Sequence, residues 1–568
     1  MKVLFNFLGL AAIVISCTGG PAWARLDNGG WMSRDLAISK DQSTVYATTV
    51  TDGGSDCAGK DYEPLTLWAF CANGLCPETC DGGSNTPCKW RIPICEARGT
   101  KSDSSDPKGY HASYAPPAVS ADGKYIAAVS VNGLAHIVNS DGTEVYPGLD
   151  EHGHHNDYAE RNRGMSFYAR PVIDQWNFTN NVTTSGTTTT YECTGYRLYA
   201  LSRDGRLAAW QSVPNCNADD EQGRWEFIAT HGWPYRPELG GKPVRGPFLF
   251  EPLIDSDSPL RSDACGARIY FGSENSKEGL FSIDPCGSGA DEPTTDWRCF
   301  WRKKGQQSNG ALQTLTFTLG GTIDNFTDGD SVGGKKLLIA NAKNGTVAIN
   351  LDEPPSTTDC LADSGSGAAY KEHWLHVGGK KAVGNQDERT HRSYPTVSKD
   401  KRSIYLTGKG GAVIELLALN PMANGDSFSP QTNGGESGYF FPETGSIPDI
   451  SFSSATANPH DGFVYFGTSK KGGIYRVAPL SSSEGNALPE DSLWFPVSPP
   501  DGWRTSPAFT KATGPSGQMH RIHIGSAKGR LYTIRLPNPA EADHHAMHGE
   551  SDREWCWDTR TNKPCDPD

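Results

Sequence analysis

Cationic side chains recur just before short strand-like segments along this 568-residue chain. They are Arg34, His111, Arg163, Arg170, Arg245, Arg392 and Arg504. A guanidinium group offers a planar fork of donors that matches carboxylate, phosphate or sulfate. If the segments that follow converge, these side chains would form a cationic channel mouth that binds an anionic small molecule or a glycan. The alternative is that they pair with acidic neighbours such as Asp35, Glu160 and Glu388, because buried rim charges need partners.

Histidines gather in two polar stretches. His152, His154 and His155 lie near Glu151 and Asp157, and a second group follows in "EADHHAMHGE" from residue 541. Imidazole and carboxylate together suit zinc or copper, so the first group is a candidate metal site. The alternative is a solvated connector, which histidine-rich loops often are. No Cys-x-x-Cys occurs in the chain, so a cysteine zinc site is not predicted.

The elements that must position these residues recur eight times. Each copy has a segment often opened by proline, as in "APPAVSADG" from Ala115, and then two strand-like runs around a glycine turn, as in "FVYFGTSKKGGIYRV" from Phe463. An aromatic segment follows, marked by Trp90, Tyr146, Trp225, Trp297, Trp374, Tyr439, Trp494 and finally Trp555 or Trp557. Four antiparallel strands repeated radially predict an all-β, eight-bladed β-propeller.

The copies start near residues 34, 113, 168, 248, 314, 393, 450 and 505, and no linker separates them. We therefore expect one domain over residues 25–568, with a cysteine-rich insertion at 52–100. Two stacked β-sandwiches would also give many short strands, but they have no reason to repeat one strand–turn–strand pattern eight times.

The repeat pattern x-Pro-x-Val-Ser-x-Asp-Gly…Ile-Tyr-x-Gly-Ser-x-x-Gly-x-Leu-Tyr-x-Ile-Asp/Arg resembles that of the pyrroloquinoline-quinone-like propellers. This quinoprotein alcohol dehydrogenase-like superfamily is typically eight-bladed and includes enzymes and non-catalytic scaffolds. The resemblance implies either a scaffold or a dehydrogenase of alcohols or sugars that uses the quinone (PQQ) with Ca²⁺. The chain has no adjacent cysteine pair, no Cys-x-x-Cys-His and no intact Ala-x-Asp-x-x-Thr-Gly-x-x-x-Trp signature. We therefore expect a ligand-binding or scaffold module, with the quinoprotein dehydrogenase as the alternative.

The first residues predict export. A short apolar run from Val3 to Ile15 and the small-x-small sequence Ala22-Trp23-Ala24 indicate a signal peptide over residues 1–24. Val14-Ile15-Ser16-Cys17 also resembles a bacterial lipobox, so lipidation at Cys17 is a competing prediction. No later stretch is long enough for a membrane helix. We expect a secreted or periplasmic protein whose partner is a ligand or another exported protein.

The charge balance argues against nucleic acid as a partner. The formal net charge is −14, and the lysines and arginines are scattered rather than clustered. Asn177, Asn181, Asn325 and Asn344 lie in glycosylation sequons, which matter only in a eukaryotic source. The threonine-rich segment from Asn177 to Thr190 is expected to be an exposed loop.

Cysteine usage predicts disulfides. Processing at either site removes Cys17 from the fifteen cysteines, and the even remainder in an exported chain favours disulfides over free thiols. Six cysteines between Cys57 and Cys95 are expected to staple the insertion. Cys193 with Cys216, and Cys265 with Cys286, flank turn candidates symmetrically, and Cys556 could pair with Cys565, which leaves Cys299 for Cys360. Sequence alone does not fix this connectivity.

Overall fold

The computed structural model describes most of the repeat strands and the turns between them. The described residues are 23–24, 31–32, 35–50, 62–73, 76, 88–97, 115–130, 135–146, 167–184, 187–203, 207–212, 225–231, 250–255, 268–273, 280–284, 296–301, 305–306, 312–313, 317–327, 334–342, 345–352, 372–377, 394–407, 413–419, 439–440, 454–467, 474–477, 493–495, 503, 505–514, 517–526, 531–536, 557–558 and 563–564. All regular elements among them are β-strands, as the sequence predicts, and none is a helix that could cross a membrane.

Eight antiparallel sheets follow one another along the described chain, and we number them in that order. Sheet 1 holds β2 (Trp31–Met32), β3 (Ala37–Ile38), β4 (Thr44–Val50), β5 (Tyr62–Cys71) and β6 (Trp90–Ala97). Sheet 2 holds β7 (Ala118–Val119), β8 (Tyr125–Val129), β9 (Ala135–Asn139) and β10 (Glu144–Tyr146). Sheet 3 holds β11 (Val172–Thr184), β12 (Thr187–Leu201), β13 (Leu207–Ser212) and β14 (Trp225–His231). Sheet 4 holds β15 (Leu253–Asp255), β16 (Arg268–Gly272), β17 (Leu280–Asp284) and β18 (Asp296–Trp301).

The other four sheets have the same strand order. Sheet 5 holds β21 (Phe317–Phe326), β22 (Lys335–Ala342), β23 (Gly345–Asn350) and β24 (Glu372–Val377). Sheet 6 holds β25 (Thr396–Val397), β26 (Ser403–Thr407), β27 (Val413–Leu417) and β28 (Tyr439–Phe440). Sheet 7 holds β29 (Thr456–Ala457), β30 (Val464–Gly467), β31 (Ile474–Val477) and β32 (Leu493–Phe495). Sheet 8 holds β33 (Ala508–Gly514), β34 (Gly517–Gly525), β35 (Leu531–Leu536) and β1 (Trp23–Ala24).

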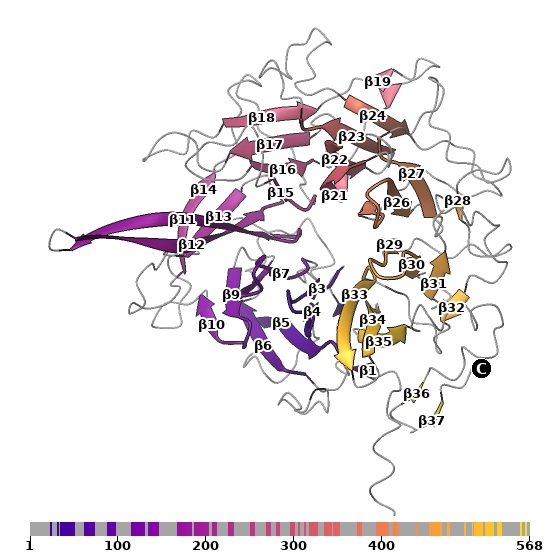
Figure 1. Ribbon diagram of the computed structural model, residues 1–568, viewed down its shortest axis with the longest axis horizontal. Helices are drawn as coiled ribbons and strands as arrows, with labels where there is room; N and C mark the ends of the chain where they lie inside the picture. The colour runs from indigo at the N-terminus through magenta and orange to yellow at the C-terminus, as the bar shows by residue number, and fades with distance from the viewer. Residues whose placement is uncertain are drawn as a thin grey trace, which may run out of the picture.

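Two short hairpins complete the described strands. One pairs β19 (Gly305–Gln306) with β20 (Leu312–Gln313), and the other pairs β36 (Trp557–Asp558) with β37 (Lys563–Pro564). The eight larger sheets lie around a common centre, with β3, β7, β15, β29 and β33 on the inside (Figure 1). This is the arrangement of a β-propeller.

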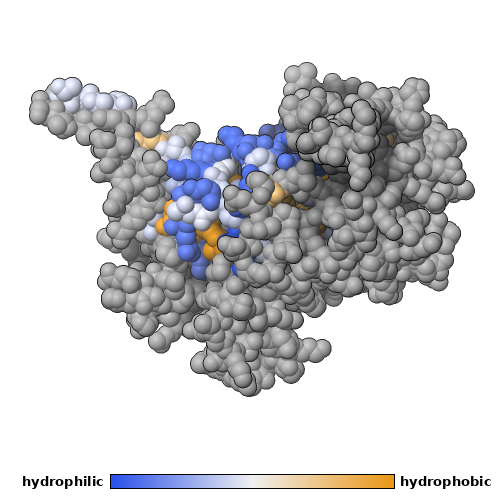
Figure 2. All heavy atoms as spheres, turned by 90° about the horizontal axis from the view of Figure 1, so that it is seen from below, coloured by the Kyte–Doolittle hydropathy of each residue, from blue (hydrophilic) through white to orange (hydrophobic). Residues whose placement is uncertain are grey.

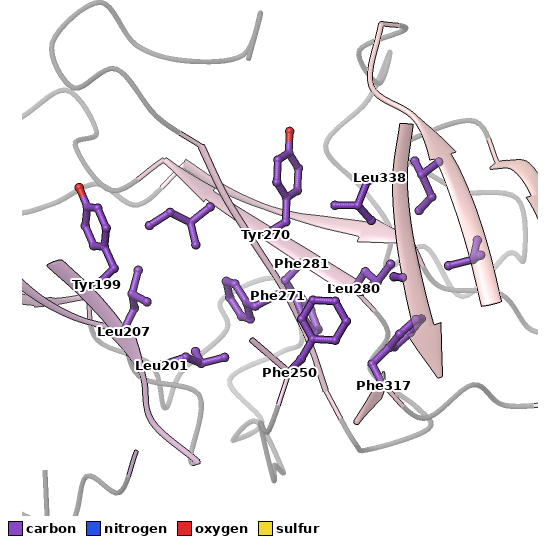
Figure 3. Close-up of a cluster of buried hydrophobic side chains, with 14 of the residues drawn as sticks. Tyr199, Leu201, Leu207, Phe250, Tyr270, Phe271, Leu280, Phe281, Phe317 and Leu338 are labelled. Carbon is purple, nitrogen blue, oxygen red and sulfur yellow. The ribbon is translucent and has the colours of Figure 1, made fainter. Parts of the chain in front are cut away.

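Hydrophobic clusters join each sheet to the next. Tyr46 of sheet 1 packs in one cluster with Ile126 of sheet 2, and Phe250 and Phe317 join sheets 4 and 5 edge to face, with ring centroids 6.1 Å apart (Figure 3). Leu531 of sheet 8 belongs to the same cluster as Trp68 of sheet 1. Because the last sheet packs on the first, the sheets share their cores around a ring.

This packing explains the composition of the second strands. β8, β16, β26 and β30 are buried along their whole length, since each sheet is covered on both faces by its neighbours. Their sequences are therefore nearly continuous apolar and aromatic runs rather than alternating ones. The aromatic segments predicted to form outer strands do so in seven sheets, from Trp90 in β6 to Trp494 in β32.

A Ser-x-Asp turn connects the first two strands in several sheets. In sheet 2 the Ser120 hydroxyl donates to Asp122 at 2.6 Å and accepts from the Tyr125 amide at 3.0 Å. Gly123 follows with a φ of 81°, which suits glycine. Ser39–Asp41 and Ser398–Asp400 form the same turn in sheets 1 and 6.

The outer strand of sheet 8 corrects the sequence prediction. Trp557 does not supply it: Trp557 lies in β36, which pairs with β37, whereas β1 pairs with β35 through Trp23↔Tyr532 and Ala24↔Leu531. Trp555 lies outside the described residues. The prediction was wrong because a fourth strand needs only to lie beside its partner in space, and in a ring the chain start lies beside the chain end.

The loop predicted for the threonine-rich segment is also wrong. Residues 177–184 and 187–190 are not a loop but belong to β11 and β12, which pair continuously from Val172↔Tyr199 to Thr184↔Thr187. Threonine has a high β-propensity, and here it extends the strands beyond the sheet.

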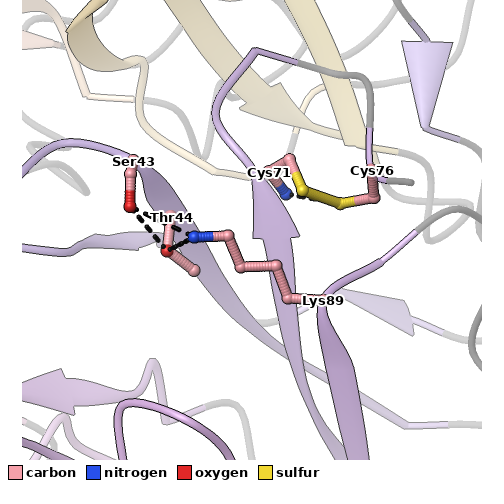
Figure 4. Close-up of a disulfide and its surroundings, with 5 residues drawn as sticks. All are labelled: Ser43, Thr44, Cys71, Cys76 and Lys89. Atoms are coloured by element: carbon pink, nitrogen blue, oxygen red, sulfur yellow. Dashed lines mark hydrogen bonds between the residues drawn. A yellow bond between two sulfur atoms is a disulfide. The ribbon is translucent and has the colours of Figure 1, made fainter. Parts of the chain in front are cut away.

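One disulfide is described completely. Cys71 bonds to Cys76 at the end of β5, within the cysteine-rich set, and the Cys71 amide donates to Cys76 Sγ at 3.0 Å (Figure 4). Cys88 and Cys193 are also disulfide-bonded. Cys216, Cys265, Cys286, Cys360, Cys556 and Cys565 lie outside the described residues, so the four pairings from the sequence stay predictions.

Candidate functional site: an axial polar ring

Eight positions, one in each sheet, lie at the inner ends of the sheets: seven stand two residues before the first strand, and the one in sheet 5 lies within β21. They are Asp35, Pro116, Arg170, Glu251, Gly320, Tyr394, Ser454 and Ser506, one for each sheet. Proline follows in sheets 2, 3, 4, 6 and 8. Because the first strands face the centre, these positions surround the axis of the propeller.

Arg170 connects three sheets at this level. Its Nη2 donates to Asp35 Oδ2 at 2.7 Å and to the Leu36 carbonyl at 3.3 Å, which joins sheet 3 to sheet 1. Its Nε lies 3.8 Å from Glu251 Oε2 of sheet 4. The side chains of Arg170, Asp35 and Glu251 are 27%, 17% and 10% exposed, so the ion pairs are largely shielded from water.

Tyr394 extends the network from sheet 6 to sheet 4. Its hydroxyl donates a hydrogen bond to Glu251 Oε1. The ring passes over Gly320 of the intervening sheet 5, where an added Cβ would lie 2.9 Å from Tyr394 Cε1. Glycine at this position therefore permits the close approach of the tyrosine ring.

Serine hydroxyls close the network. The Tyr394 amide donates to Ser454 Oγ at 2.7 Å, and the Ser454 amide donates to Ser506 Oγ at 3.2 Å. A backbone hydrogen bond from Ser506 then reaches Asp35. We call the closed set Asp35, Arg170, Glu251, Tyr394, Ser454 and Ser506 the axial polar ring.

The electrostatics of the ring favour one charged arginine and a neutral tyrosine. Burial lowers the pKa of Arg170, but the carboxylates of Glu251 and Asp35 outweigh it and hold the pKa above its ordinary value. Burial raises the pKa of Asp35, and the Arg170 guanidinium opposes this rise. Burial and Glu251 raise the pKa of Tyr394 well above its usual range, so the phenol stays protonated and serves as a donor.

This geometry bears on the predicted cationic mouth. Arg170 is the one predicted mouth residue within the described part, and its guanidinium is engaged with carboxylates rather than turned toward an open site. The remaining candidates, Arg34, His111, Arg163, Arg245, Arg392 and Arg504, lie outside the described residues, as do His152, His154 and His155. Among described residues, no group of three histidine, cysteine or acidic side chains could hold a metal ion.

Most members of the axial polar ring were not predicted from the sequence. Glu251, Tyr394 and Ser506 each directly precede the proline of their repeat, and Arg170 does so as well. Aligning the residue before that proline across all repeats would have placed an arginine, a glutamate and a tyrosine at one level of the channel. Of the sequons, Asn177 and Asn181 lie in β11, Asn325 is exposed in β21, and Asn344 lies outside the described residues.

Histidines lie on both faces of sheet 8: His520 meets His460 of sheet 7, and His523 lies on the opposite face, the one that packs against sheet 1. His460 stacks on His520 with ring centroids 4.1 Å apart. His523 is fully buried between the hydroxyls of Thr510 and Thr533, at 2.8 and 2.9 Å. Burial, reinforced by Arg521, lowers the pKa of His523 to about 3. Burial, His520 and nearby lysines lower the pKa of His460 to about 4.

The sheet arrangement and the closed axial contacts define the class: an all-β protein of β-propeller architecture. Its fold is similar to BamB from Moraxella catarrhalis, with 8% identity, 90% of this chain and 98% of that chain covered, and a TM-score of 0.42. It is also similar to the β-propeller domain of Cps50 (Swd1) from Myceliophteria thermophila, with 9% identity, 77% and 93% covered, and a TM-score of 0.34. Dihydro-heme d1 dehydrogenase NirN matches at 11% identity, with 79% and 63% covered and a TM-score of 0.35. No family model and no curated protein matches the chain. Similarities this low do not bear on function.

Proposed function

We propose that the protein is an exported propeller that serves as a scaffold. It is a single domain of residues 25–568 together with the closing strand β1 (Trp23–Ala24), and its surface binds another exported protein. The observation that carries this proposal is the charge compensation of the axial polar ring. Arg170 faces two carboxylates and a protonated tyrosine faces one of them, so the polar groups at the centre bind one another. Such a centre joins the sheets and leaves recognition to the outer surfaces.

Charge compensation also argues against an anion at this level of the channel. An anionic small molecule or acidic glycan near Arg170 would lie beside Asp35 and Glu251, and burying like charges together is unfavourable. The same holds for a tricarboxylate quinone. The alternative, a PQQ- and Ca²⁺-dependent dehydrogenase, rests on the repeat pattern alone, and fold does not determine function.

Two measurements on the purified chain test the proposal. First, PQQ, sulfate or a uronic sugar should leave the melting temperature unchanged, because a ligand raises it only if it binds the folded state. Second, incubation with PQQ and Ca²⁺ should give no dye-linked oxidation of alcohols or sugars. A salt-sensitive thermal shift would favour an anion-binding module, and oxidation would favour the quinoprotein dehydrogenase; either result overturns the scaffold proposal.

A further inference from the structure

A two-stranded ribbon extends from sheet 3 beyond the ring of sheets. β11 and β12 form thirteen register pairs, but β13 covers β12 only from Arg197 to Leu201. From Gln175↔Tyr196 to Thr184↔Thr187, no third strand among the described residues pairs with either edge. We call this part, Gln175–Tyr196, the ribbon. Its base contacts sheet 2, where the Asp122 amide donates to Gln175 and the Tyr196 hydroxyl donates to Asp122. Its outer part extends beyond the other sheets in Figure 1, and the pale tip at the far left projects from the molecule in Figure 2.

The ribbon lacks the features that protect exposed strand edges. Natural edges carry lysine, proline, charges or bulges that prevent pairing with another chain. Between Gln175 and Tyr196 the sequence has no lysine, arginine or proline, its one charged residue is Glu192, and the pairing has no bulge. Eight of its residues are threonines, which favour extended pairing. A two-stranded ribbon is marginal in water, so a further strand would stabilise it.

The charge distribution indicates which partner fits this edge. The chain carries a net charge of −14, so two copies repel each other when their sheets approach. About ten strand residues give the ribbon a reach of roughly 30 Å. That reach exceeds the screening length of about 8 Å at physiological salt, so two ribbons can meet while the acidic bodies stay apart. Because the ribbon is nearly neutral, it does not attract an acidic or a basic partner by charge. A second identical strand would place threonines opposite threonines, and such cross-strand pairs are favourable.

We propose that this ribbon is a self-association arm: two copies of the chain join edge to edge through β12, in antiparallel order about a twofold axis. Thr187, Thr188, Thr189 and Thr190 are exposed along this strand. The β11 edge is the less suitable one, because it carries the sequons at Asn177 and Asn181. An isologous contact closes after two copies, so the arm produces a dimer rather than a filament.

Light scattering coupled to size exclusion, on the full chain, tests the arm. The wild type should be a dimer, and raising the salt from about 0.15 M to about 1 M should leave the dimer fraction unchanged, because the charged bodies are already screened from each other. Replacing Asn180–Tyr191 by Asn-Gly joins Thr179 to its partner Glu192 through a two-residue turn. This shortened variant should be monomeric and keep its melting temperature.

Matched point variants separate edge pairing from other contacts. Thr188→Lys/Thr190→Lys places like charges on both ribbons and should weaken dimerisation about tenfold or more. Thr188→Val/Thr190→Val keeps β-branched, uncharged residues and should stay dimeric. A monomeric wild type, or a shortened variant that still dimerises, would overturn the proposal. Dimerisation is measured on the purified chain without a ligand or a partner protein. The result therefore does not depend on whether the scaffold proposal holds.

Discussion

The aromatic ring of Tyr394 lies so close to Gly320 that a methyl group on the glycine would overlap it. The close approach lets the tyrosine hydroxyl reach Glu251 across sheet 5. One glycine therefore permits a contact between two sheets that are not neighbours.

Gly320→Ala should move the Tyr394 ring and weaken its bond to Glu251. We expect a loss of about 1–3 kcal/mol in the free energy of unfolding, the usual cost of overpacking. Denaturant titration measures it. In the double variant Gly320→Ala/Tyr394→Ser the overlap is gone, so the alanine should add almost no further loss. Full additivity of the two substitutions would show that Gly320 and Tyr394 act separately.

Arg170→Met should destabilise the protein because it leaves Asp35 and Glu251 near each other without a cation. Removing one partner of a buried pair costs about 3 kcal/mol or somewhat more. The loss should be larger at pH 7 than near pH 4, since protonated carboxyls no longer need the guanidinium. Arg170→Lys, which keeps the charge, is the control and should lose less. An equal loss at both pH values would contradict the ion-pair role.

Acidification should destabilise sheet 8 at the face that packs against sheet 1. His523 has its folded pKa lowered to about 3, so the folded state stays neutral while the unfolded chain takes up a proton near pH 6.5. The stability from neutral His523 is thus complete above pH 6.5 and is lost as the pH falls below it, by about 1.4 kcal/mol per pH unit. Urea unfolding between pH 7.5 and 5 measures the slope. His523→Gln should reduce the slope, and the lowered pKa values of His460 and His520 should keep the remainder. An unchanged slope would assign the effect to these other groups.

Truncation at the two ends distinguishes the closing strand from the tail. Removing residues 1–24 takes away β1 and leaves β35 as an exposed edge. We expect a lower melting temperature and aggregation relative to a chain that starts at residue 23. Removing Trp555–Asp568 should have a small effect, because among the described strands β36 and β37 pair with each other and with no strand of sheet 8. The opposite ranking would show that the tail covers sheet 8.

Cys193 tests the predicted connectivity of sheet 3. It is disulfide-bonded, and Cys216 is the partner expected from the symmetry of the intervening turn. Peptide mapping under non-reducing conditions should recover these two cysteines in one linked peptide, and the paired replacement by serine should cost about 2–4 kcal/mol. Recovery of Cys193 with any other cysteine would refute the pairing.

More of the fold than of the axial polar ring could be predicted from the sequence. The repeat can be recognised from features that lie within a single copy. Examples are the Ser-x-Asp turn at Ser120 and the aromatic residue of each outer strand, such as Trp90 and Trp494. Ring closure is not local, so the strand at Trp23 was missed. The contact of Arg170 with Glu251 likewise depends on how far each sheet turns about the axis, which no single repeat encodes.

The pairing of β1 with β35 has a consequence for the order of folding. Ala24 comes before sheet 1 in the chain, and its partner Leu531 comes after sheet 7. The hairpins of sheets 1 to 7 need only segments close in sequence and can form while the chain is still growing. Sheet 8 is complete only after all seven intervening sheets have been synthesised, so we expect the slowest step to be the pairing of β35 with β1, which closes the ring.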